Sequence, residues 1–377
     1  MKVSSGTGLV HRLGVWMEQD PSSTISFKRF MQACLYDEDY GYYMTNNTKV
    51  GKAGDFYTSS NIGTVMGEVL ARDLISRMRL FNASVPGIDI AEWGGGTGRL
   101  AKQILDELQK LAPELYTRIR YSIIEESPFH QERQKLELKE HEAVTRVISS
   151  AEWLRGGPYS SVIVLANELL DAFSVERCVY KEGTGWHQVR VGWNQRHEEF
   201  TEFHTLLEDG ELLKYLQAYI LHPQSGQVAE VNLDAEDWVQ SIAESIVQGN
   251  LIVIDYGDTY EEIYAPHRLH GTLLCYYKHS ATTNPYIRVG DQDITTHVNF
   301  TGLMHAGSRS GMEVERYSTQ KKFLLDAGLL EWLTEHSHSD PFHPVAKRNR
   351  AVRQLLISDS MSELFKVLVL SKTNKRR

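Results

Sequence analysis

The feature that most limits the fold is an apolar segment, GIDIAEW (residues 87–93), that runs directly into the glycine cluster GGGTG (residues 94–98). A stretch with apolar side chains at helical spacing follows at residues 100–111. Glycines in such a turn let the backbone bend tightly and bring N–H groups close to a ligand at the start of a helix. The segment therefore predicts a strand, a ligand-binding turn and a helix.

The same alternation continues along the chain. Further apolar runs, YSIIE (121–125), SSVIVLA (160–166) and NLIVIDYG (250–257), are separated by helical patterns, and FKVLVL (365–370) predicts a last strand. Strands interleaved with helices indicate an α/β fold with a doubly wound, Rossmann-like parallel sheet. Ligands of such sheets bind outside the carboxyl ends of the strands.

Two regions depart from this alternation of strands and helices. Residues 1–86 predict an N-terminal helical extension that includes a glycine-rich flap loop at residues 40–61. Residues 87–377 predict the main domain, with an insertion at about 173–250 that opens with a β-hairpin at residues 174–193. We expect the insertion to elaborate the core as a hairpin-helix region rather than to form an independent domain.

Composition excludes several classes of protein. The 377 residues carry a net charge of −9, which argues against a large surface for nucleic acid. The sequence lacks an apolar run long enough to span a bilayer, so we expect no membrane insertion. Its beginning has neither an apolar core nor more than one arginine, which predicts a cytoplasmic (bacterial) protein, or a mitochondrial matrix protein if it is eukaryotic.

Cysteine and histidine offer no metal site at the sequence level. Cys34, Cys178 and Cys275 are far apart, which predicts reduced, buried thiols rather than disulfides or a metal knuckle. The short-spaced histidine pairs lack a carboxylate or cysteine companion at ligand spacing. We therefore expect no metal.

The residues around the glycine cluster narrow the choice of cofactor. A dinucleotide fingerprint would need glycine where Arg99 stands, and a nucleoside triphosphate loop would need a GK[ST] sequence that is missing here. Glu92, directly before the glycines, would repel a pyrophosphate. It suits the ammonium and sulfonium charges of S-adenosyl-L-methionine. The pattern favours this cofactor over a nucleotide, although a nucleotide-dependent oxidoreductase stays an alternative.

Acidic residues lie at the carboxyl ends of the next two predicted strands. Glu125 and Glu126 end the second strand, where a carboxylate can bind both hydroxyls of a ribose, and the short alternation does not decide which of them points inward. The third strand ends in Asn167, Glu168 and, three residues later, Asp171. These acids lie where a transferable methyl group would project, although acids that merely begin a helix remain the alternative.

Five motifs then carry a resemblance. GKAGDFYTSS, EWGGGTGRLA, IIEESP, ANELLDAF and DITTHVNF occur in the order seen in MidA-like methyltransferases, a family that includes the mitochondrial assembly factor of respiratory complex I, a protein-arginine methyltransferase. The resemblance covers about residues 25–370. It implies a class I methyltransferase sheet and methyl transfer to an arginine side chain of a partner protein, such as a respiratory-complex subunit. The alternative is a cofactor-binding assembly factor without catalysis.

The resemblance also assigns residues. It implies a cofactor site of Glu92, Gly94, Gly96, Gly98, Glu125 and Asn167, closed by a loop with Gly54, Asp55 and Phe56. On the substrate side it implies Glu168 as the carboxylate that pairs with the guanidinium, helped by Asp171 and Asp55. The tight [DN]PP[YF] turn of enzymes that methylate DNA bases or glutamine amides is missing after the third strand.

Two positions depart from the family pattern. Gly95 stands where the family commonly has proline, and Asn299 stands where it commonly has aspartate. The second change removes a charge near His297, which weakens an acid–base role for that motif.

Overall fold

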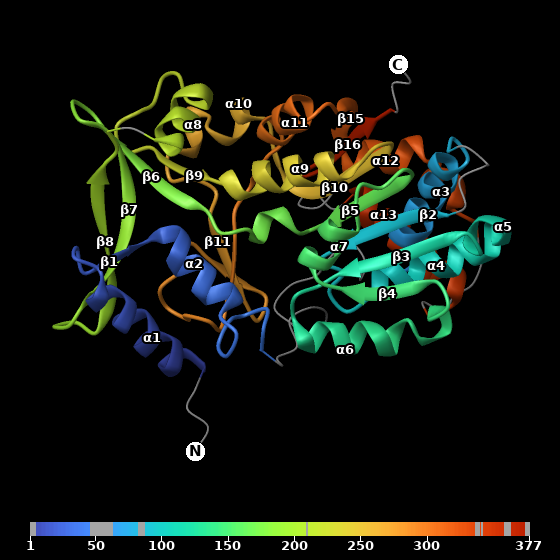
Figure 1. Cartoon of the computed structure of the whole chain (residues 1–377), viewed down its shortest axis with the longest axis horizontal. Helices are drawn as coiled ribbons and strands as arrows, with labels where there is room; N and C mark the ends of the chain where they lie inside the picture. Colours follow the sequence, from blue (N-terminus) through green and yellow to red (C-terminus); the bar gives the residue numbers. More distant parts are fainter. Residues whose placement is uncertain are drawn as a thin grey trace. The chain divides into compact units, whose positions relative to one another are not determined.

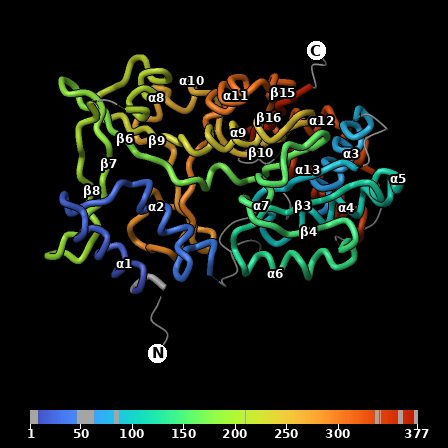
Figure 2. The backbone as a smooth tube through the Cα atoms, in the orientation of Figure 1, coloured from blue at the N-terminus to red at the C-terminus, as the bar shows by residue number. Residues whose placement is uncertain are grey.

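The computed structural model describes residues 5–45, 63–81, 87–208, 210–335, 340, 342–357 and 363–373, with side chains from residue 8 onward. The chain forms two compact units, each assembled from three segments, whose course can be followed in Figures 1 and 2. Unit 1 comprises Met1–Phe56, Leu170–Trp238 and Gly257–Leu303. Unit 2 comprises Tyr57–Leu169, Val239–Tyr256 and Met304–Arg377.

Unit 2 is built on a sheet with the strand order β15-β16-β10-β5-β2-β3-β4. The strands from β10 to β4 run parallel, and β16 is antiparallel to both of its neighbours. The chain adds strands on opposite sides of β2, so β2 and β5 flank the topological switch point. The bounds are β2 (Ile88–Trp93), β3 (Ile119–Ile124), β4 (Thr145–Ile148), β5 (Val162–Asn167), β10 (Gly249–Asp258), β15 (Glu313–Thr319) and β16 (Phe365–Lys372).

Figure 1 shows these strands side by side with helices around them. The helices of unit 2 are α3 (Val65–Met78), α4 (Arg99–Leu111), α5 (Pro113–Tyr116), α6 (Pro128–Glu137), α7 (Ser150–Gly156), α12 (Gln320–Asp326) and α13 (Pro344–Ile357). Two more helices, α9 (Leu233–Ser245) and α11 (Phe300–Arg309), begin in unit 1 and end in unit 2. The predicted α/β doubly wound sheet is confirmed.

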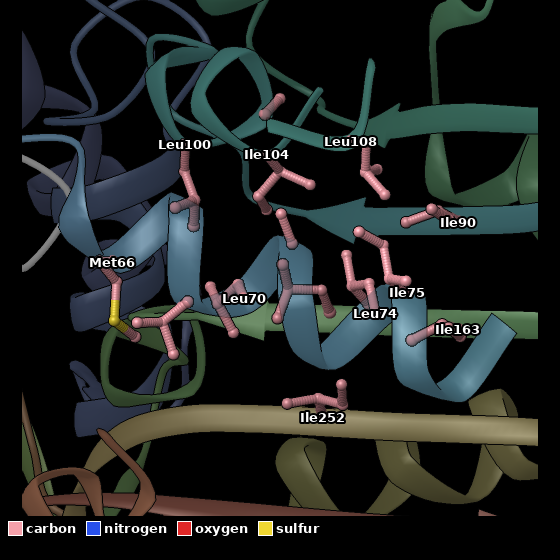
Figure 3. Packing of buried hydrophobic residues seen from close by; sticks show 14 of the residues in the cluster. Met66, Leu70, Leu74, Ile75, Ile90, Leu100, Ile104, Leu108, Ile163 and Ile252 are labelled. Atoms are coloured by element: carbon pink, nitrogen blue, oxygen red, sulfur yellow. The ribbon is translucent and has the colours of Figure 1, made fainter. Parts of the chain in front are cut away.

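The core of unit 2 packs against the central strands of the sheet. Side chains of α3, among them Leu70 and Leu74, point toward α4 and the sheet, as Figure 3 shows. Ile90 of β2, Ile163 of β5 and Ile252 of β10 belong to the same buried cluster. Each fully buried aliphatic side chain contributes about 1.5–3 kcal/mol. A continuous apolar layer therefore covers the three central strands.

Unit 1 contains two antiparallel sheets. The larger has the order β1-β7-β6-β9 with β8 beside β7, and the smaller has the order β12-β11-β13. The predicted hairpin is present as β6 and β7. The bounds are β1 (Thr24–Ser26), β6 (Glu176–Lys181), β7 (Gly185–Asn194), β8 (Glu199–Leu206), β9 (Val228–Val231), β11 (Leu274–Tyr277), β12 (Ser280–Thr282), β13 (Asp293–Thr295), α1 (Ser5–Gln19), α2 (Phe27–Tyr36), α8 (Glu211–Tyr219) and α10 (Tyr260–Ile263).

Residues far apart in the sequence meet in unit 1. β1 pairs with β7, with Ile25 opposite Val191. Phe30 of α2 packs edge-on against Phe200 of β8, with ring centroids 5.3 Å apart. A further short strand, β14 (Val298–Asn299), pairs with Gly257 and Asp258 at the end of β10. The three predicted free thiols are confirmed, and all of them are buried in this unit.

None of the helices in the described part of the chain has the length and apolar character needed to cross a membrane.

Candidate active site

The glycine loop follows β2 as predicted. Gly94, Gly96 and Gly98 have φ values of +66°, +52° and +83°, a region in which side chains other than glycine are strained. The N–H of Gly94 donates to the carbonyl of Ile124 on β3 (3.0 Å), and α4 begins directly after Gly98. A Cβ on Gly96 would meet no atom of the described residues within 4 Å. The loop can therefore approach a ligand through its backbone.

Gly94 also touches the turn that follows β5. A Cβ on Gly94 would lie 2.8 Å from Cδ1 of Leu169, which is closer than real Cβ contacts allow. The positive φ favours glycine at this position, and a larger residue would also require the Leu169 side chain to move. Leu169 therefore links the glycine loop to the residues that end β5.

Glu92 lies inside the sheet, just before the loop. It is 2% exposed, and its Oε2 accepts a 2.7 Å hydrogen bond from the Tyr121 hydroxyl of β3. Burial raises the pKa of Glu92 to about 7, and the Tyr121 hydrogen bond opposes the rise. Among the described residues it has no ion-pair partner. A buried carboxylate of this kind fits a cationic group such as the ammonium of S-adenosyl-L-methionine.

Glu125 and Glu126 separate clearly in the structure. The Glu125 carboxylate accepts hydrogen bonds from the Ser127 N–H (2.9 Å) and from Nε2 of Gln134 (3.2 Å). Burial raises the pKa of Glu125 to about 7. Glu126 is exposed, and its Oε1 accepts a 2.8 Å hydrogen bond from the Ser150 N–H at the start of α7. Glu125 is therefore the inward residue, and Glu126 caps a helix.

Gln134 of α6 connects Glu125 to the glycine loop. Its side chain is 0% exposed, and its Nε2 also donates to the Gly96 carbonyl at 2.9 Å. The Oε1 of Gln134 is buried and accepts no hydrogen bond from the described residues. Glu125 and the glycine loop are thus hydrogen-bonded to the same side-chain amide, that of Gln134.

The turn after β5 carries Asn167 and Glu168. Glu168 has a φ of +52°, and its N–H donates to the Ile254 carbonyl of β10 (2.8 Å). Nδ2 of Asn167 donates to Oε1 of Glu168 (3.2 Å). The Oδ1 of Asn167 is buried and accepts no hydrogen bond from the residues that the structure describes, so it can accept one from a ligand. The Leu169 N–H donates to Oδ2 of Asp255 (3.1 Å).

Unit 2 brings together most of the predicted residues. Glu92, Glu125 and Glu168 end or follow the adjacent strands β2, β3 and β5, with the glycine loop between β2 and α4. Asp171 belongs to unit 1, where it is buried in a short 3₁₀ turn, Leu170–Ala172, and its carbonyl accepts from the Thr296 N–H. Gly54, Asp55 and Phe56 lie outside the described residues.

The asparagine that departs from the family pattern has a structural partner. Nδ2 of Asn299 donates to the Tyr215 hydroxyl (2.8 Å), and its Oδ1 accepts from the Gly302 N–H in the first turn of α11 (3.3 Å). Both bonds are available to a neutral amide. Asn299 therefore fits a role in holding α11.

Sequence reasoning missed Tyr121, Gln134 and Asp255. Tyr121 and Gln134 lie on a strand and a helix whose patterns show only core and solvent faces. Asp255 could have been identified from the sequence, because it is a carboxylate within the apolar run NLIVIDYG. Among the described residues there is no group of three or more His, Cys, Asp or Glu that could hold a metal ion.

Solved structures share the fold of this chain. A crystal structure of a protein from Burkholderia thailandensis bound to S-adenosyl-homocysteine matches with a TM-score of 0.85 and 29% identity, over 98% of this chain and 92% of that one. A native crystal structure of a protein from the same organism matches with a TM-score of 0.83 and 26% identity, over the same shares. The strand order and these neighbours identify the class I methyltransferase fold.

Relatives are also found by sequence. The mitochondrial protein arginine methyltransferase NDUFAF7 homolog of Drosophila melanogaster is 26% identical over 313 residues, which cover 76% of this chain and 67% of the fly protein. The mitochondrial protein arginine methyltransferase NDUFAF7 of Mus musculus is 26% identical over 305 residues, 74% of this chain and 65% of the mouse protein. The chain thus spans about two thirds of the length of these relatives.

A model of a family of S-adenosyl-L-methionine-dependent methyltransferases matches residues 69–318, well over half of the chain. The glycine loop, the carboxylates at the ends of β2 and β3 and the start of the turn after β5 all fall within that match. The chain therefore belongs to this family of S-adenosyl-L-methionine-dependent methyltransferases, and S-adenosyl-L-methionine is its cofactor.

Proposed function

We propose that this methyltransferase transfers its methyl group to an arginine side chain of a partner protein, with Glu168 as the carboxylate that pairs with the guanidinium. The main support for the proposal is the position of Glu168 in the fold. It follows β5 at the carboxyl edge of the sheet, in a left-handed conformation, with a side chain that is partly exposed. The names of the fly and mouse relatives support arginine as the acceptor.

For the cofactor we propose contacts from three strand ends. Glu92 and Oδ1 of Asn167 would accept hydrogen bonds from the methionyl ammonium, and the backbone of Gly94, Gly96 and Gly98 would approach the ligand. Glu125 would accept the two ribose hydroxyls. Its Oε1 accepts from the Ser127 N–H and its Oε2 from Gln134, and a carboxylate has further lone pairs that can accept both hydroxyls. When bound, S-adenosyl-L-methionine supplies a methyl group activated by the sulfonium charge.

On the substrate side the chemistry is mainly electrostatic. A guanidinium is protonated across the physiological pH range and offers paired N–H donors in one plane. Glu168 would accept two of these hydrogen bonds, orient the attacking nitrogen and offset the positive charge. Transfer leaves S-adenosyl-homocysteine and a methylated guanidinium, with one proton released. Asp171 and Asp55 are proposed helpers, and Gly54 and Phe56 are proposed to close over the cofactor.

The experiment uses an acceptor pool that lacks the modification. Protein extract from cells without the gene is incubated with purified enzyme and S-adenosyl-L-methionine carrying a radiolabelled methyl group, and labelled proteins are hydrolysed to amino acids. We expect the label in methylarginines. A respiratory-complex subunit is the first partner to inspect among the labelled bands.

The matched control is Glu126→Gln, which changes an exposed glutamate shortly after β3, two strands away from β5 in the sheet. This variant should label the extract at the wild-type rate, whereas Glu168→Gln should label it far more slowly. Label in another amino acid would overturn the arginine assignment. An enzyme that transfers no label, yet restores assembly of the partner in cells, would instead be a cofactor-binding assembly factor.

A further inference from the structure

A buried carboxylate that has no role in the proposed function lies on β10, next to β5 in the sheet. Asp255 is 0% exposed and follows the apolar residues Ile252, Val253 and Ile254. Burying an ionised carboxylate is unfavourable unless hydrogen bonds or charges compensate it. The partners of Asp255 therefore indicate what it is for.

Two of these partners are backbone N–H groups. Oδ1 of Asp255 accepts from Tyr256, its own neighbour, at 2.9 Å, and Oδ2 accepts from Leu169 at 3.1 Å. The second bond crosses from β10 to the turn after β5. A carboxylate forms stronger hydrogen bonds with N–H donors than a neutral acceptor does. Asp255 thus ties the two neighbouring strands together at the edge where ligands bind.

The residue before Asp255 holds the same turn from the other side of Glu168. The carbonyl of Ile254 accepts from the Glu168 N–H (2.8 Å), and Asp255 accepts from the Leu169 N–H (3.1 Å). These two N–H groups flank the Cα of Glu168. Consecutive residues of β10 therefore fix both peptide groups that set the conformation of Glu168.

This conformation needs such support. Glu168 has a φ of +52°, and a residue with a side chain persists there only where its surroundings hold it. Without the bond from Leu169, the second peptide group would be free to rotate toward an ordinary extended or helical conformation. That rotation would change the direction in which the Glu168 side chain leaves the backbone.

We propose that Asp255 is a positioning residue, whose carboxylate holds the turn after β5 so that Glu168 presents its own carboxylate to the substrate guanidinium. The inference rests on the proposed function of Glu168. It assigns to Asp255 an effect that passes through Glu168, rather than a contact of its own with substrate. The experiment therefore tests whether the effect of Asp255 depends on Glu168.

The first test is a double-mutant cycle with Asp255→Asn, Glu168→Gln and both together, assayed for methyl transfer to the extract from cells without the gene. Asp255→Asn alone should lower the transfer rate on the order of 10²-fold, the effect of a misplaced catalytic group. In the Glu168→Gln background the same change should lower it by less than about threefold, because residues that act as a unit are not additive. Equal losses in both backgrounds would overturn the proposal.

The matched control is Asp89→Asn. Asp89 is also a buried carboxylate of a central strand, but it lies near the amino end of β2 and pairs with Arg120 at 2.6 Å. This variant should lower the melting temperature and leave the transfer rate near that of wild type. If it reduces transfer as much as Asp255→Asn, the effect of the latter is general destabilisation.

The second test does not need activity. Hydrogen exchange of the peptide around residues 165–170 should quicken in Asp255→Asn and stay unchanged in Asp89→Asn, with affinity for S-adenosyl-homocysteine kept in both. Asp255→Ser, which retains an acceptor without the charge, replaces the asparagine variant if that fails to fold. Unchanged exchange overturns this inference alone. Full transfer by Glu168→Gln would overturn the proposed function, and the role given to Asp255 with it.

Discussion

The hydroxyl of Tyr121 on β3 donates a 2.7 Å hydrogen bond to Oε2 of Glu92 on β2, inside the sheet and next to the glycine loop. Desolvation raises the pKa of Glu92 to about 7, and this hydrogen bond limits the rise. Glu92 is therefore a carboxylate that changes charge near neutral pH. A cationic ligand should bind the ionised form more tightly, which couples cofactor binding to pH.

The first prediction is a pH dependence of cofactor affinity. As the pH falls below about 7, Glu92 becomes increasingly protonated, and the ionised form that pairs with the cofactor ammonium becomes less populated. Affinity should therefore fall as the pH is lowered through about 7. Tyr121→Phe removes the hydrogen bond to the ionised form and should move the midpoint to higher pH. Calorimetry from pH 5.5 to 8.5 measures both curves, and identical midpoints would contradict the assignment.

The Glu92 carboxylate should also make the stability of the ligand-free protein depend on pH. The pKa of Glu92 in the folded state, about 7, is above the usual value of 4.5 for a glutamate. Its favourable contribution to stability is therefore full below pH 4.5 and is lost as the pH rises through about 7. Glu92→Gln does not titrate. The free energy of unfolding of wild type, relative to this variant, should fall between pH 4.5 and 7, which urea denaturation at several pH values can measure.

A third prediction separates the two adjacent glutamates. Glu125→Ala should weaken binding of S-adenosyl-homocysteine by about 1–3 kcal/mol, since it removes buried hydrogen bonds to the ribose. Glu126→Ala changes an exposed residue that caps α7, so it should leave that affinity near the wild-type value. Titration calorimetry compares the two directly, with NAD as a ligand that we expect to bind poorly. Equal effects of the two substitutions would remove Glu125 from the site.

The contact between Gly94 and Leu169 gives a fourth prediction. Gly94→Ala places a methyl group 2.8 Å from Cδ1 of Leu169 and strains a residue with a φ of +66°. Cofactor affinity should fall at least tenfold, which is about 1.4 kcal/mol. Leu169→Ala added to Gly94→Ala removes the clash but not the strain, so it should restore the affinity only in part. A double variant no better than Gly94→Ala would show that the clash is unimportant.

Much of the sheet could be predicted from the sequence because its strands are buried on both faces. β2, β5 and β10 read as continuous apolar runs bounded by turn residues, and each was predicted within a few residues of its bounds. β4 was missed because its four residues, TRVI, do not alternate between polar and apolar and only Ile148 is buried. A short edge strand leaves too little pattern to identify it.

The candidate site was predictable only in part. Glu92 and the glycines stand out because they interrupt an apolar pattern, and they lie where the sequence placed them. The hydrogen bonds from Tyr121 and Gln134 depend on how β3 and α6 pack, which local patterns do not carry. Local patterns do not predict the pairing of β1 with β7 either, because it joins Ile25 to a residue on a strand far along the chain.

The most direct measurement of the central claim is the turnover of Glu168→Gln against wild type on one identified arginine-bearing partner, at saturating S-adenosyl-L-methionine. Glutamine keeps the size of the side chain and removes the charge that pairs with the guanidinium. The rate of methyl transfer should fall by about 10²–10⁴-fold if the carboxylate acts in the transition state. The affinity for S-adenosyl-homocysteine should stay nearly the same, because Glu168 is assigned to the substrate side. Wild-type turnover by Glu168→Gln would contradict the account.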